Sequence, residues 1–514
     1  VGAVAGAAAR RDASHAKAAF VAFACAWVIA GVLNTIVGMV QVFAPDLAEG
    51  QWIASTNLPG RAVGNLRQPN HLSSLLLWAV IAAVALAELG ALSRRLVAAL
   101  IAIFLFGVVL TASRTGVVSV LLLAVWGALD RRLAPRMRLV LLAAPVFYVL
   151  AWFGMTQWAE LSQRTFGGAV RMAEDVIGGA DAPSARLTIW THTLALIRES
   201  PWLGVGFGEF NFAWTLTSFP GRPKEFFDHT HNLPLHLAVE LGLPLAAAVM
   251  AMLLLALWRA ARAAWRGGKE AAATLSIGAV AEADAGAAGA RAGVLMVLMI
   301  GLHSLLEYPL WYAYFLLPIA WAWGYAMGGR NSQIAPAAAP AEDAAPQSPP
   351  RPSLPLAAAA GAVVLGAALS IADYTRVVAI FASSDGDLPL AQRIEAGRRS
   401  VFFAHHADYA AVTSGVPMHD AATSFADTTH YLLDSRLMIA WAGWLAQQGR
   451  ADLARHLAAC LREFRSEDST EFFAECPGLV APPAGSVPAT APVQCQRPAR
   501  TPNWHEYLAV PARR

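Results

Sequence analysis

The feature that most limits how this chain can fold is a series of apolar stretches, most of them long enough to cross a lipid bilayer. A transmembrane helix needs about 20 predominantly apolar residues. The candidate spans lie near 18–43, 71–92, 96–112, 116–129, 139–154, 233–258, 291–308, 310–327 and 355–372. Only 14% of the residues are charged, whereas soluble domains have about 25%. The sequence therefore predicts an all-α, polytopic membrane protein with about nine transmembrane helices.

The stretch 96–129 is apolar throughout but too long for a single crossing. The tetrapeptide Ser-Arg-Thr-Gly at 113–116 interrupts it. We therefore predict a hairpin of two helices with Arg114 at the turn.

Basic residues predict the orientation of these spans, because Lys and Arg are enriched in short cytoplasmic loops. With nine spans, five basic clusters fall on one side of the membrane. They begin at Arg10, Arg94, Arg131, Arg259 and Arg330. We assign that side to the cytoplasm. The opposite side then holds the loops 44–70 and 155–232, the turns at Arg114 and Glu307, and the tail from residue 373.

The predicted domain plan follows from the same pattern. Residues 1–330 form a transmembrane domain that includes the long loop 155–232, and 355–372 is a further transmembrane helix. The Pro- and Ala-rich segment 331–354 between them is expected to be a flexible cytoplasmic linker. Residues 373–514 form a soluble, mainly helical C-terminal region, for which Ala451 to Phe464 is the clearest amphipathic helix.

Two of the four cysteines lie close together in this C-terminal region. Cys476 and Cys495 are separated by a short, Pro-rich segment. Disulfides persist outside the cytoplasm, where we place the tail. We therefore predict a disulfide between them.

Polar residues that are unusual near a membrane gather on the non-cytoplasmic side, where they are candidates for function. They come from segments far apart in the sequence. The set comprises Gln68, Asn70, His71, Arg114, Arg186, His231, Asn232, His303, Glu307 and Tyr308.

This set supplies the groups needed to transfer a unit from a diphosphate to a hydroxyl. Guanidinium groups bind phosphate oxygens bidentately, so Arg114 and Arg186 are candidate diphosphate ligands. Histidine is the side chain best suited to act as a base near neutral pH, which makes His231 the candidate base. The remaining polar side chains of the set are candidates for orienting the sugar or the acceptor.

Each of these residues also has a purely structural interpretation. The segment 68–71 could cap a helix, and Arg114 could anchor at the lipid headgroups. His231 could bond to backbone. His303 and Glu307 could pair with each other, since they are four residues apart. His236 and Glu240 lie deeper in a span, where a buried structural pair is the preferred interpretation.

Other functional classes have less support. Asp228, His229 and His231 could ligate a metal ion, but two histidines without an assured further ligand are a weak signal. The net charge of +3 gives no indication of nucleic-acid binding. A transporter would need polar residues near the midplane rather than at one face. A membrane anchor that presents the tail as a binding module would leave the polar set unexplained.

At these residues the chain resembles the PglL-type bacterial protein O-oligosaccharyltransferases, within the O-antigen ligase and polymerase superfamily. The similar segments are 64–72 (GNLRQPNHL), 113–116, 185–190 with 201–208, 229–233 with 240–242, and 307–312 (EYPLWY). The resemblance runs from about residue 50 to 328 and weakly to 430. Members of the family usually have several more membrane helices before the first of these segments, whereas we find one span there.

The resemblance implies a metal-independent glycosyltransferase of the GT-C kind that needs no cofactor. It implies an inner-membrane enzyme that takes a glycan from undecaprenyl diphosphate on the periplasmic side and transfers it to a periplasmic protein. By analogy His231 is the catalytic histidine, Arg114 and Arg186 bind the diphosphate, and Gln68 and Tyr308 belong to the site. An O-antigen ligase that acts on lipid A core and an O-antigen polymerase remain alternatives, because they share this chemistry.

Overall fold

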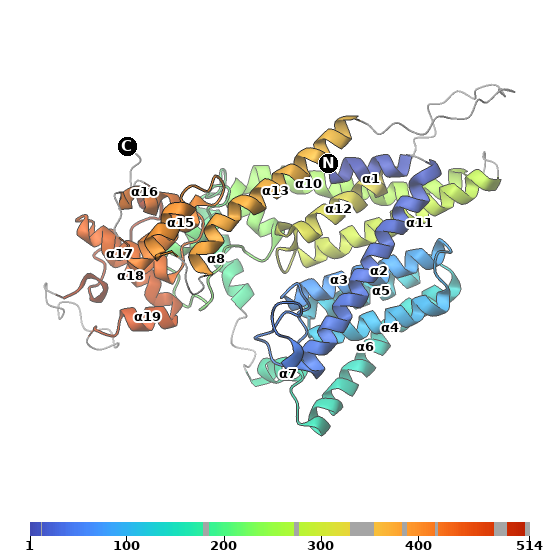
Figure 1. The fold of residues 1–514 in the computed structure, drawn as a ribbon, viewed down its shortest axis with the longest axis horizontal. Coiled ribbons are helices and arrows are strands. Elements are labelled where there is room, and N and C mark those ends of the chain that lie inside the picture. The colour runs from blue at the N-terminus through green and yellow to red at the C-terminus, as the bar shows by residue number, and fades with distance from the viewer. Residues whose placement is uncertain are drawn as a thin grey trace. The chain divides into compact units, whose positions relative to one another are not determined.

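The computed structural model describes residues 1–11, 13–177, 185–271, 277–328, 354–382, 388–416, 420–476 and 491–508. In these ranges all regular secondary structure is helical, as predicted for an all-α protein. The chain divides into two compact units. Unit 1 comprises 1–182 and 251–356, and unit 2 comprises 183–250 and 357–514. Each unit therefore combines segments that are distant in the sequence (Figure 1).

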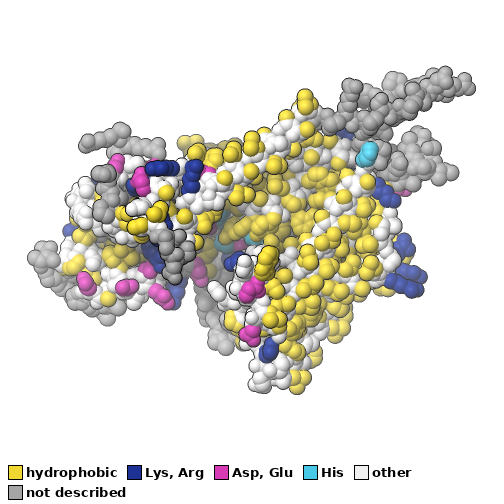
Figure 2. All heavy atoms as spheres, in the orientation of Figure 1, with side chains coloured by type: hydrophobic (Ala, Val, Ile, Leu, Met, Phe, Trp, Pro, Cys, Tyr) yellow, Lys and Arg dark blue, Asp and Glu magenta, His cyan; other side chains and the backbone are white. Residues whose placement is uncertain are grey.

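Unit 1 is a helical bundle. Its helices are α1 (Gly2–Arg11), α2 (Ala13–Phe43), α3 (Pro69–Glu88), α4 (Arg94–Thr111), α5 (Arg114–Leu129), α6 (Pro135–Ser162), α7 (Gly167–Ile177), α11 (Ile277–His303) and α12 (Ala313–Met327). Helix α3 runs through the middle of this bundle, and nearly all of its side chains are buried. Hydrophobic side chains cover much of the visible outer face of unit 1 (Figure 2), as expected for a bundle surrounded by lipid.

Seven of the described helices are long and apolar enough to cross a membrane. The spans are His15–Phe43, Pro69–Glu88, Arg94–Thr111, Pro135–Ser162, Leu233–Trp265, Asp284–His303 and Leu354–Phe381. The protein is thus a polytopic membrane protein. The other two of the nine predicted spans coincide with α5 and α12, which have 16 and 15 residues and are shorter than the others. Several boundaries differ from the prediction. Helices α6 and α13 extend to Ser162 and Phe381, beyond the predicted ends at 154 and 372, and α11 ends at His303, which leaves Glu307 in the turn that follows.

The predicted hairpin in 96–129 is present. Helix α4 ends at Thr111, Ala112 takes a left-handed conformation with a φ of 50°, and α5 begins at Arg114. The Ser113 hydroxyl caps α5 by accepting a hydrogen bond from the backbone N–H of Gly116 at 3.1 Å. The polar tetrapeptide therefore interrupts the apolar stretch by supplying an N-cap, which satisfies a backbone donor at the new helix start.

Hydrogen bonds bring several of the basic segments to one end of unit 1. The Glu88 carboxylate, at the end of α3, accepts a hydrogen bond from the backbone N–H of Ala134, in the segment that joins α5 to α6. In that segment Arg132 donates to the carbonyl of Trp265 at 2.7 Å. The opposite end of the bundle holds the loop before α3, where Arg61 donates to the carbonyl of Thr111. The basic segments that start with Arg94, Arg131 and Arg259 thus lie at the same end.

This arrangement leads to a topology prediction. Alkaline phosphatase fused after residue 400 should be active, because the predicted odd number of spans and a cytoplasmic start place the tail in the periplasm. The same reporter fused after Arg266 should be inactive. Enzyme activity in whole cells, normalised to the amount of fusion protein, measures both. The reverse pattern would overturn the orientation.

Unit 2 is built from the segment 183–250 and the C-terminal region. Its helices are α8 (Ala185–Glu199), α9 (Phe210–Leu216), the first part of α10 (Leu233–Ala271), α13 (Leu354–Phe381), α14 (Leu390–Gly397), α15 (Ala404–Ser414), α16 (Ala421–Thr428), α17 (Ser435–Gln447), α18 (Ala451–Phe464), α19 (Glu467–Phe472) and α20 (His505–Leu508). Helix α18 has the bounds predicted from its amphipathic pattern, and its apolar stripe is fully buried.

The core of unit 2 joins the two parts of the chain. Phe212 and Trp214 of α9 belong to the same buried cluster as Trp441 of α17 and Phe464 of α18. The rings of Trp214 and Phe464 make an edge contact with centroids 5.6 Å apart. The segment 183–250 is therefore packed into the C-terminal region and is not a free loop.

The predicted disulfide between Cys476 and Cys495 is present. Of the described cysteines, Cys25 and Cys460 are not in a disulfide. Replacing Cys476 and Cys495 by Ser should lower the free energy of unfolding of unit 2 by about 2–4 kcal/mol, because the bridge restricts the unfolded chain. Mass spectrometry of non-reduced peptides would verify the bridge, and free thiols at both positions would contradict it.

Candidate functional site

A polar cluster in unit 1 connects three of the sequence segments singled out above. The Asn70 side chain donates from Nδ2 to Glu307 Oε1 at 2.9 Å and accepts at Oδ1 from the Ser113 hydroxyl at 2.7 Å. Ser113 and Thr115 are also hydrogen bonded, at 2.7 Å. Asn70 thus links the start of α3, the start of α5 and the turn after α11. Arg114, at the first position of α5, is held next to this cluster with an exposed side chain.

The neighbours of Asn70 also have defined partners. Gln68 is the N-cap of α3, and its side chain accepts from the backbone N–H of His71 at 2.8 Å. The His71 ring is 2.7 Å from the hydroxyl of Tyr314. The structural interpretation of Gln68 as a helix cap is therefore correct, and a site role would come in addition to it.

The turn after α11 presents an aromatic surface. Tyr308 stacks on Tyr312 with ring centroids 6.0 Å apart, and Tyr312 meets the edge of His71 at 4.6 Å. His303 and Glu307 have different partners, since His303 Nδ1 is 2.8 Å from the Ser74 hydroxyl and Glu307 bonds to Asn70. These side-chain hydrogen bonds tie the end of α11 to α3.

In unit 2 a second set of predicted residues is connected through Trp190. Its indole N–H donates to the carbonyl of Thr230 at 2.9 Å, and Thr230 directly precedes His231. Arg186 lies four residues before Trp190 on α8, so both side chains are on the same face of that helix. The hydrogen bond therefore brings the Arg186 face of α8 to the segment that carries His231.

His231 has an unusual backbone conformation. Its φ is 53°, which lies in the left-handed region that is uncommon for residues other than Gly, although Asn, Asp and His are enriched there. Asn232 follows as the residue before α10, and its side-chain oxygen accepts from the backbone N–H of Leu235 at 3.1 Å. The left-handed residue thus ends the loop and Asn232 starts the helix. The capping role of Asn232 is an alternative to the predicted role in substrate binding.

Two histidine–carboxylate pairs surround this segment. Asp228 Oδ1 is 2.8 Å from Nδ1 of His229. Burial raises the pKa of the Asp228 carboxyl, but the contact with His229 and nearby backbone outweigh it, so that the pKa lies below its usual value. His236 and Glu240 form a buried pair at 3.5 Å, as the structural interpretation predicted.

The segment 201–208 is bonded to a break in α10. At Gly242 the helix has φ 75° and ψ 161°, which interrupts its hydrogen-bond ladder. The backbone N–H of Val205 donates to the carbonyl of Val239 at 2.8 Å, and the N–H of Leu243 donates to the carbonyl of Pro201 at 2.8 Å. A Cβ at Gly204 would lie 2.5 Å from the Glu240 carbonyl, so only glycine permits this approach.

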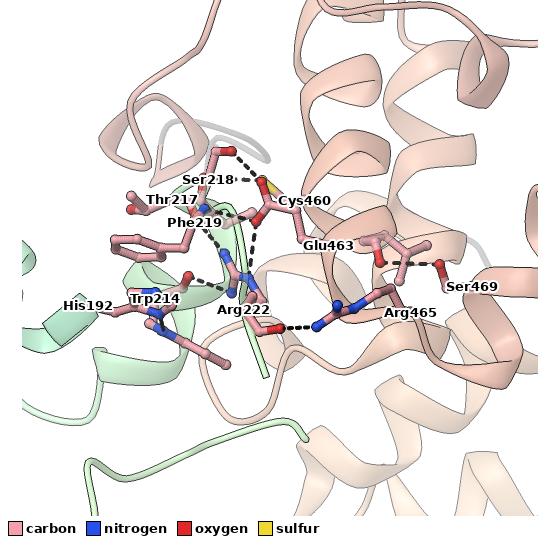
Figure 3. A network of polar contacts seen from close by, with 12 residues as sticks. His192, Trp214, Thr217, Ser218, Phe219, Arg222, Cys460, Glu463, Arg465 and Ser469 are labelled. Carbon is pink, nitrogen blue, oxygen red and sulfur yellow. Dashed lines mark hydrogen bonds and ion pairs between the residues drawn. The ribbon is translucent and has the colours of Figure 1, made fainter. Parts of the chain in front are cut away.

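A buried arginine that sequence reasoning missed joins the loop to the C-terminal region. Arg222 is 0% exposed, and its Nε donates to Glu463 of α18 at 3.2 Å. Its Nη1 donates to the carbonyl of Trp214 at 2.9 Å and its Nη2 to the carbonyl of Thr217. Figure 3 shows the guanidinium group pointing at these acceptors. Arg465 donates in turn to the carbonyl of Arg222 at 2.6 Å.

The predicted site residues thus form two sets. Gln68, Asn70, His71, Arg114, Glu307 and Tyr308 lie in unit 1, and Arg186, His231 and Asn232 lie in unit 2. Sequence reasoning had not included Ser113, Thr115 and Tyr314, which bind members of the first set. The polar tetrapeptide 113–116 was the signal for Ser113 and Thr115, whereas Tyr314 resembled any interfacial aromatic residue.

Comparison with known protein families gives three matches along the chain. Residues 98–250 match the O-antigen ligase family, and 62–87 match the protein glycosylation ligase family. Residues 292–469 match the C-terminal region of the virulence factor membrane-bound polymerases. Residues 98–250 are thus the part of the chain that is similar to the O-antigen ligase family. The protein glycosylation ligase match covers the start of α3, with Gln68, Asn70 and His71.

Two curated relatives of this protein come from Acinetobacter baylyi. A general O-oligosaccharyltransferase is 28% identical over 296 residues, which cover 55% of this chain and 48% of the relative. A ComP-specific O-oligosaccharyltransferase is 25% identical over 286 residues, or 54% of this chain and 46% of the relative. The chain thus spans about half the length of the curated relatives that it matches.

Proposed function

We propose that this protein transfers an oligosaccharide as one unit from an undecaprenyl-diphosphate carrier to Ser or Thr hydroxyls of periplasmic proteins. The reaction takes place at the periplasmic face of the bacterial inner membrane and uses no metal ion. His231 is the general base, and Arg114 and Arg186 bind the diphosphate. The names of the two relatives and the protein glycosylation ligase match support protein as the acceptor.

The hydrogen bond from Trp190 to the carbonyl of Thr230 is the observation that carries this proposal. It joins the face of α8 that bears Arg186 to the segment that bears His231. A cation that holds the leaving diphosphate and a base that accepts a proton must act on the same reacting centre. The bond provides a physical reason for both segments to serve one site.

The proposed step balances as a displacement at the anomeric carbon of the donor sugar. The acceptor oxygen forms a bond to this carbon, and the bond from the carbon to the diphosphate oxygen breaks with its electron pair. The acceptor's proton passes to His231. Undecaprenyl diphosphate leaves with additional negative charge, which guanidinium groups stabilise through charge-assisted hydrogen bonds.

The unit 1 cluster has two roles in this proposal. Asn70 and Ser113 fix the start of α5, and with it the position of Arg114. Gln68, His71, Glu307 and Tyr308 orient the sugar or the acceptor with polar and aromatic groups. The aromatic surface of Tyr308 and Tyr312 is of the kind on which sugar rings and peptides stack.

An O-antigen ligase that modifies lipid A core is the second candidate, because residues 98–250 match the O-antigen ligase family. The deciding experiment uses a cell with a lipid-linked glycan, this protein and a Ser-rich periplasmic acceptor protein, and with its own ligase deleted. Glycan on the acceptor protein is the expected result. Glycan on lipid A core alone would identify a ligase.

Loss of either arginine should weaken binding of the donor more than binding of the acceptor. Arg114→Ala and Arg186→Ala should raise the donor KM first, because each removes a cation that binds the diphosphate in the ground state as well. Initial rates at varied concentrations of donor and acceptor measure this with purified protein. An unchanged donor KM in both variants would exclude the proposed diphosphate contacts.

A further inference from the structure

The segment 201–208 contains no charged residue, and it exposes three large apolar side chains. Trp202 is 75% exposed, Leu203 is 85% exposed and Phe207 is 84% exposed. Val205, between them, is buried in the core of unit 2. The backbone of the segment is therefore fixed while its largest apolar side chains point away from the protein. Such exposed patches mark interaction surfaces.

The hydrogen bonds between this segment and α10 show beside which residues of the helix the segment lies. Val205 and Pro201 bond to Val239 and Leu243, on both sides of the break at Gly242. A Cβ at Gly242 would lie 2.2 Å from the carbonyl oxygen of Trp202, so the two backbones are in direct contact. Trp202 and Leu203 are thus held at the level of residue 242 of a membrane-spanning helix.

That level corresponds to one end of the hydrocarbon core. The part of α10 from Leu243 to Trp258, which ends at the basic cluster that begins with Arg259, is about 24 Å long at ~1.5 Å per residue, and the core is about 30 Å thick. This part crosses most of the core, so Gly242 lies near the end of the core opposite to that cluster. Leu243 and Leu245, which follow the break, are also exposed apolar residues.

We propose that Trp202, Leu203 and Phe207 insert into the interfacial region of the membrane and attach unit 2 to the bilayer surface. Trp is enriched in this region because its ring is amphipathic. The occupant is lipid, since the segment is hydrogen bonded to a membrane-spanning helix beside its exposed apolar residues Leu243 and Leu245, and carries no charge that would resist burial in lipid. This inference is independent of the proposed glycosyl transfer.

The test uses an environment-sensitive fluorophore at the tip of the segment. Leu203→Cys and Phe207→Cys are made separately in a Cys25→Ala background and labelled with a nitrobenzoxadiazole reagent. Cys460 remains unlabelled, because burial raises the pKa of its thiol to about 12. The full chain is placed in nanodiscs of phosphatidylethanolamine and phosphatidylglycerol, with and without a nitroxide attached to the acyl chain near the headgroup.

Both labels should lose most of their emission when the nitroxide lipid is present and should resist aqueous iodide. Glu225→Cys, an exposed polar position in the same unit, is the matched control and should show the opposite pattern. Quenching by iodide but not by the nitroxide at 203 and 207 would overturn the proposal. Protection from both quenchers would also overturn it, because protein rather than lipid would then cover the segment.

Discussion

Replacing His231 by Asn should lower the rate of glycan transfer by roughly 10²–10⁴-fold, the range associated with loss of a general base. Asn is preferred to Ala because His231 has a φ of 53°. Asn adopts the left-handed conformation readily, whereas Ala would add backbone strain on the order of 1–3 kcal/mol. His231→Asn therefore removes the base with little change in the loop, and His231→Ala provides a second test.

The effect should appear in single-turnover rates at saturating donor and acceptor, because the proton transfer belongs to the chemical step. His505→Ala is the matched control, since this histidine is exposed at the end of the tail and bonds only locally to Asn503 among its described partners. Gel filtration and expression level verify insertion and folding of each variant. Near-normal turnover of His231→Asn would show that another group accepts the proton.

Replacing Arg222 by Met should destabilise unit 2 by about 3–5 kcal/mol, as found when one partner of a buried ion pair is removed. Met approximates the length of the side chain but donates no hydrogen bond. It would leave the carbonyls of Trp214 and Thr217 without this buried donor. Among the described residues, Glu463 would keep only its hydrogen bonds from Ser218 and Phe219. The contact of the guanidinium group with the Trp214 ring, 4.5 Å from its centroid, would also be lost.

Limited digestion with proteinase K is a direct measurement, because the segment 183–250 becomes cleavable when it detaches from the C-terminal region. Arg222→Met should be cut there much faster than the parent protein. Arg436→Met is the matched control, since it makes the same replacement at an exposed arginine of α17 in the same unit. Equal resistance of Arg222→Met and the parent would mean that apolar packing alone holds the segment.

Much of the fold follows from local sequence properties. The bilayer sets how long an apolar helix must be and on which side basic residues are favoured. It imposes these requirements on each segment independently of tertiary contacts. All nine predicted spans therefore coincide with helices, and a polar tetrapeptide was enough to locate the turn between α4 and α5. The amphipathic pattern of α18 likewise determined its bounds, because its buried stripe has the helical period.

Predictions were less accurate where the conformation depends on tertiary contacts. The span 233–258 was predicted as one uninterrupted helix, whereas Gly242 breaks α10. The sequence Gly-Leu-Pro at 242–244 is a local signal for such a break. The backbone hydrogen bonds that stabilise it come from residues 201–206, however, and a periodicity analysis cannot identify these partners.

The same limit applies to the site. Sequence motifs identified Asn70 and Glu307 as candidates, but their mutual hydrogen bond depends on how α3 packs against the end of α11. Gln68 and Asn232 proved to cap helices, which local sequence could suggest but not distinguish from substrate binding. Arg222 had no signal, because a single arginine in a loop is usually solvated and its partner Glu463 is remote in the chain.

Unit 2 is assembled from two parts of the chain that are synthesised at different times. Arg222 and Glu463 are 241 residues apart, and helices of unit 1 lie between them in the sequence. At 5–20 residues per second, the ribosome needs on the order of tens of seconds to make the later partner. During this interval Phe212 and Trp214 have no tail to pack against. We expect the nascent segment to depend on a chaperone that shields these aromatic residues until translation of the C-terminal helices is complete.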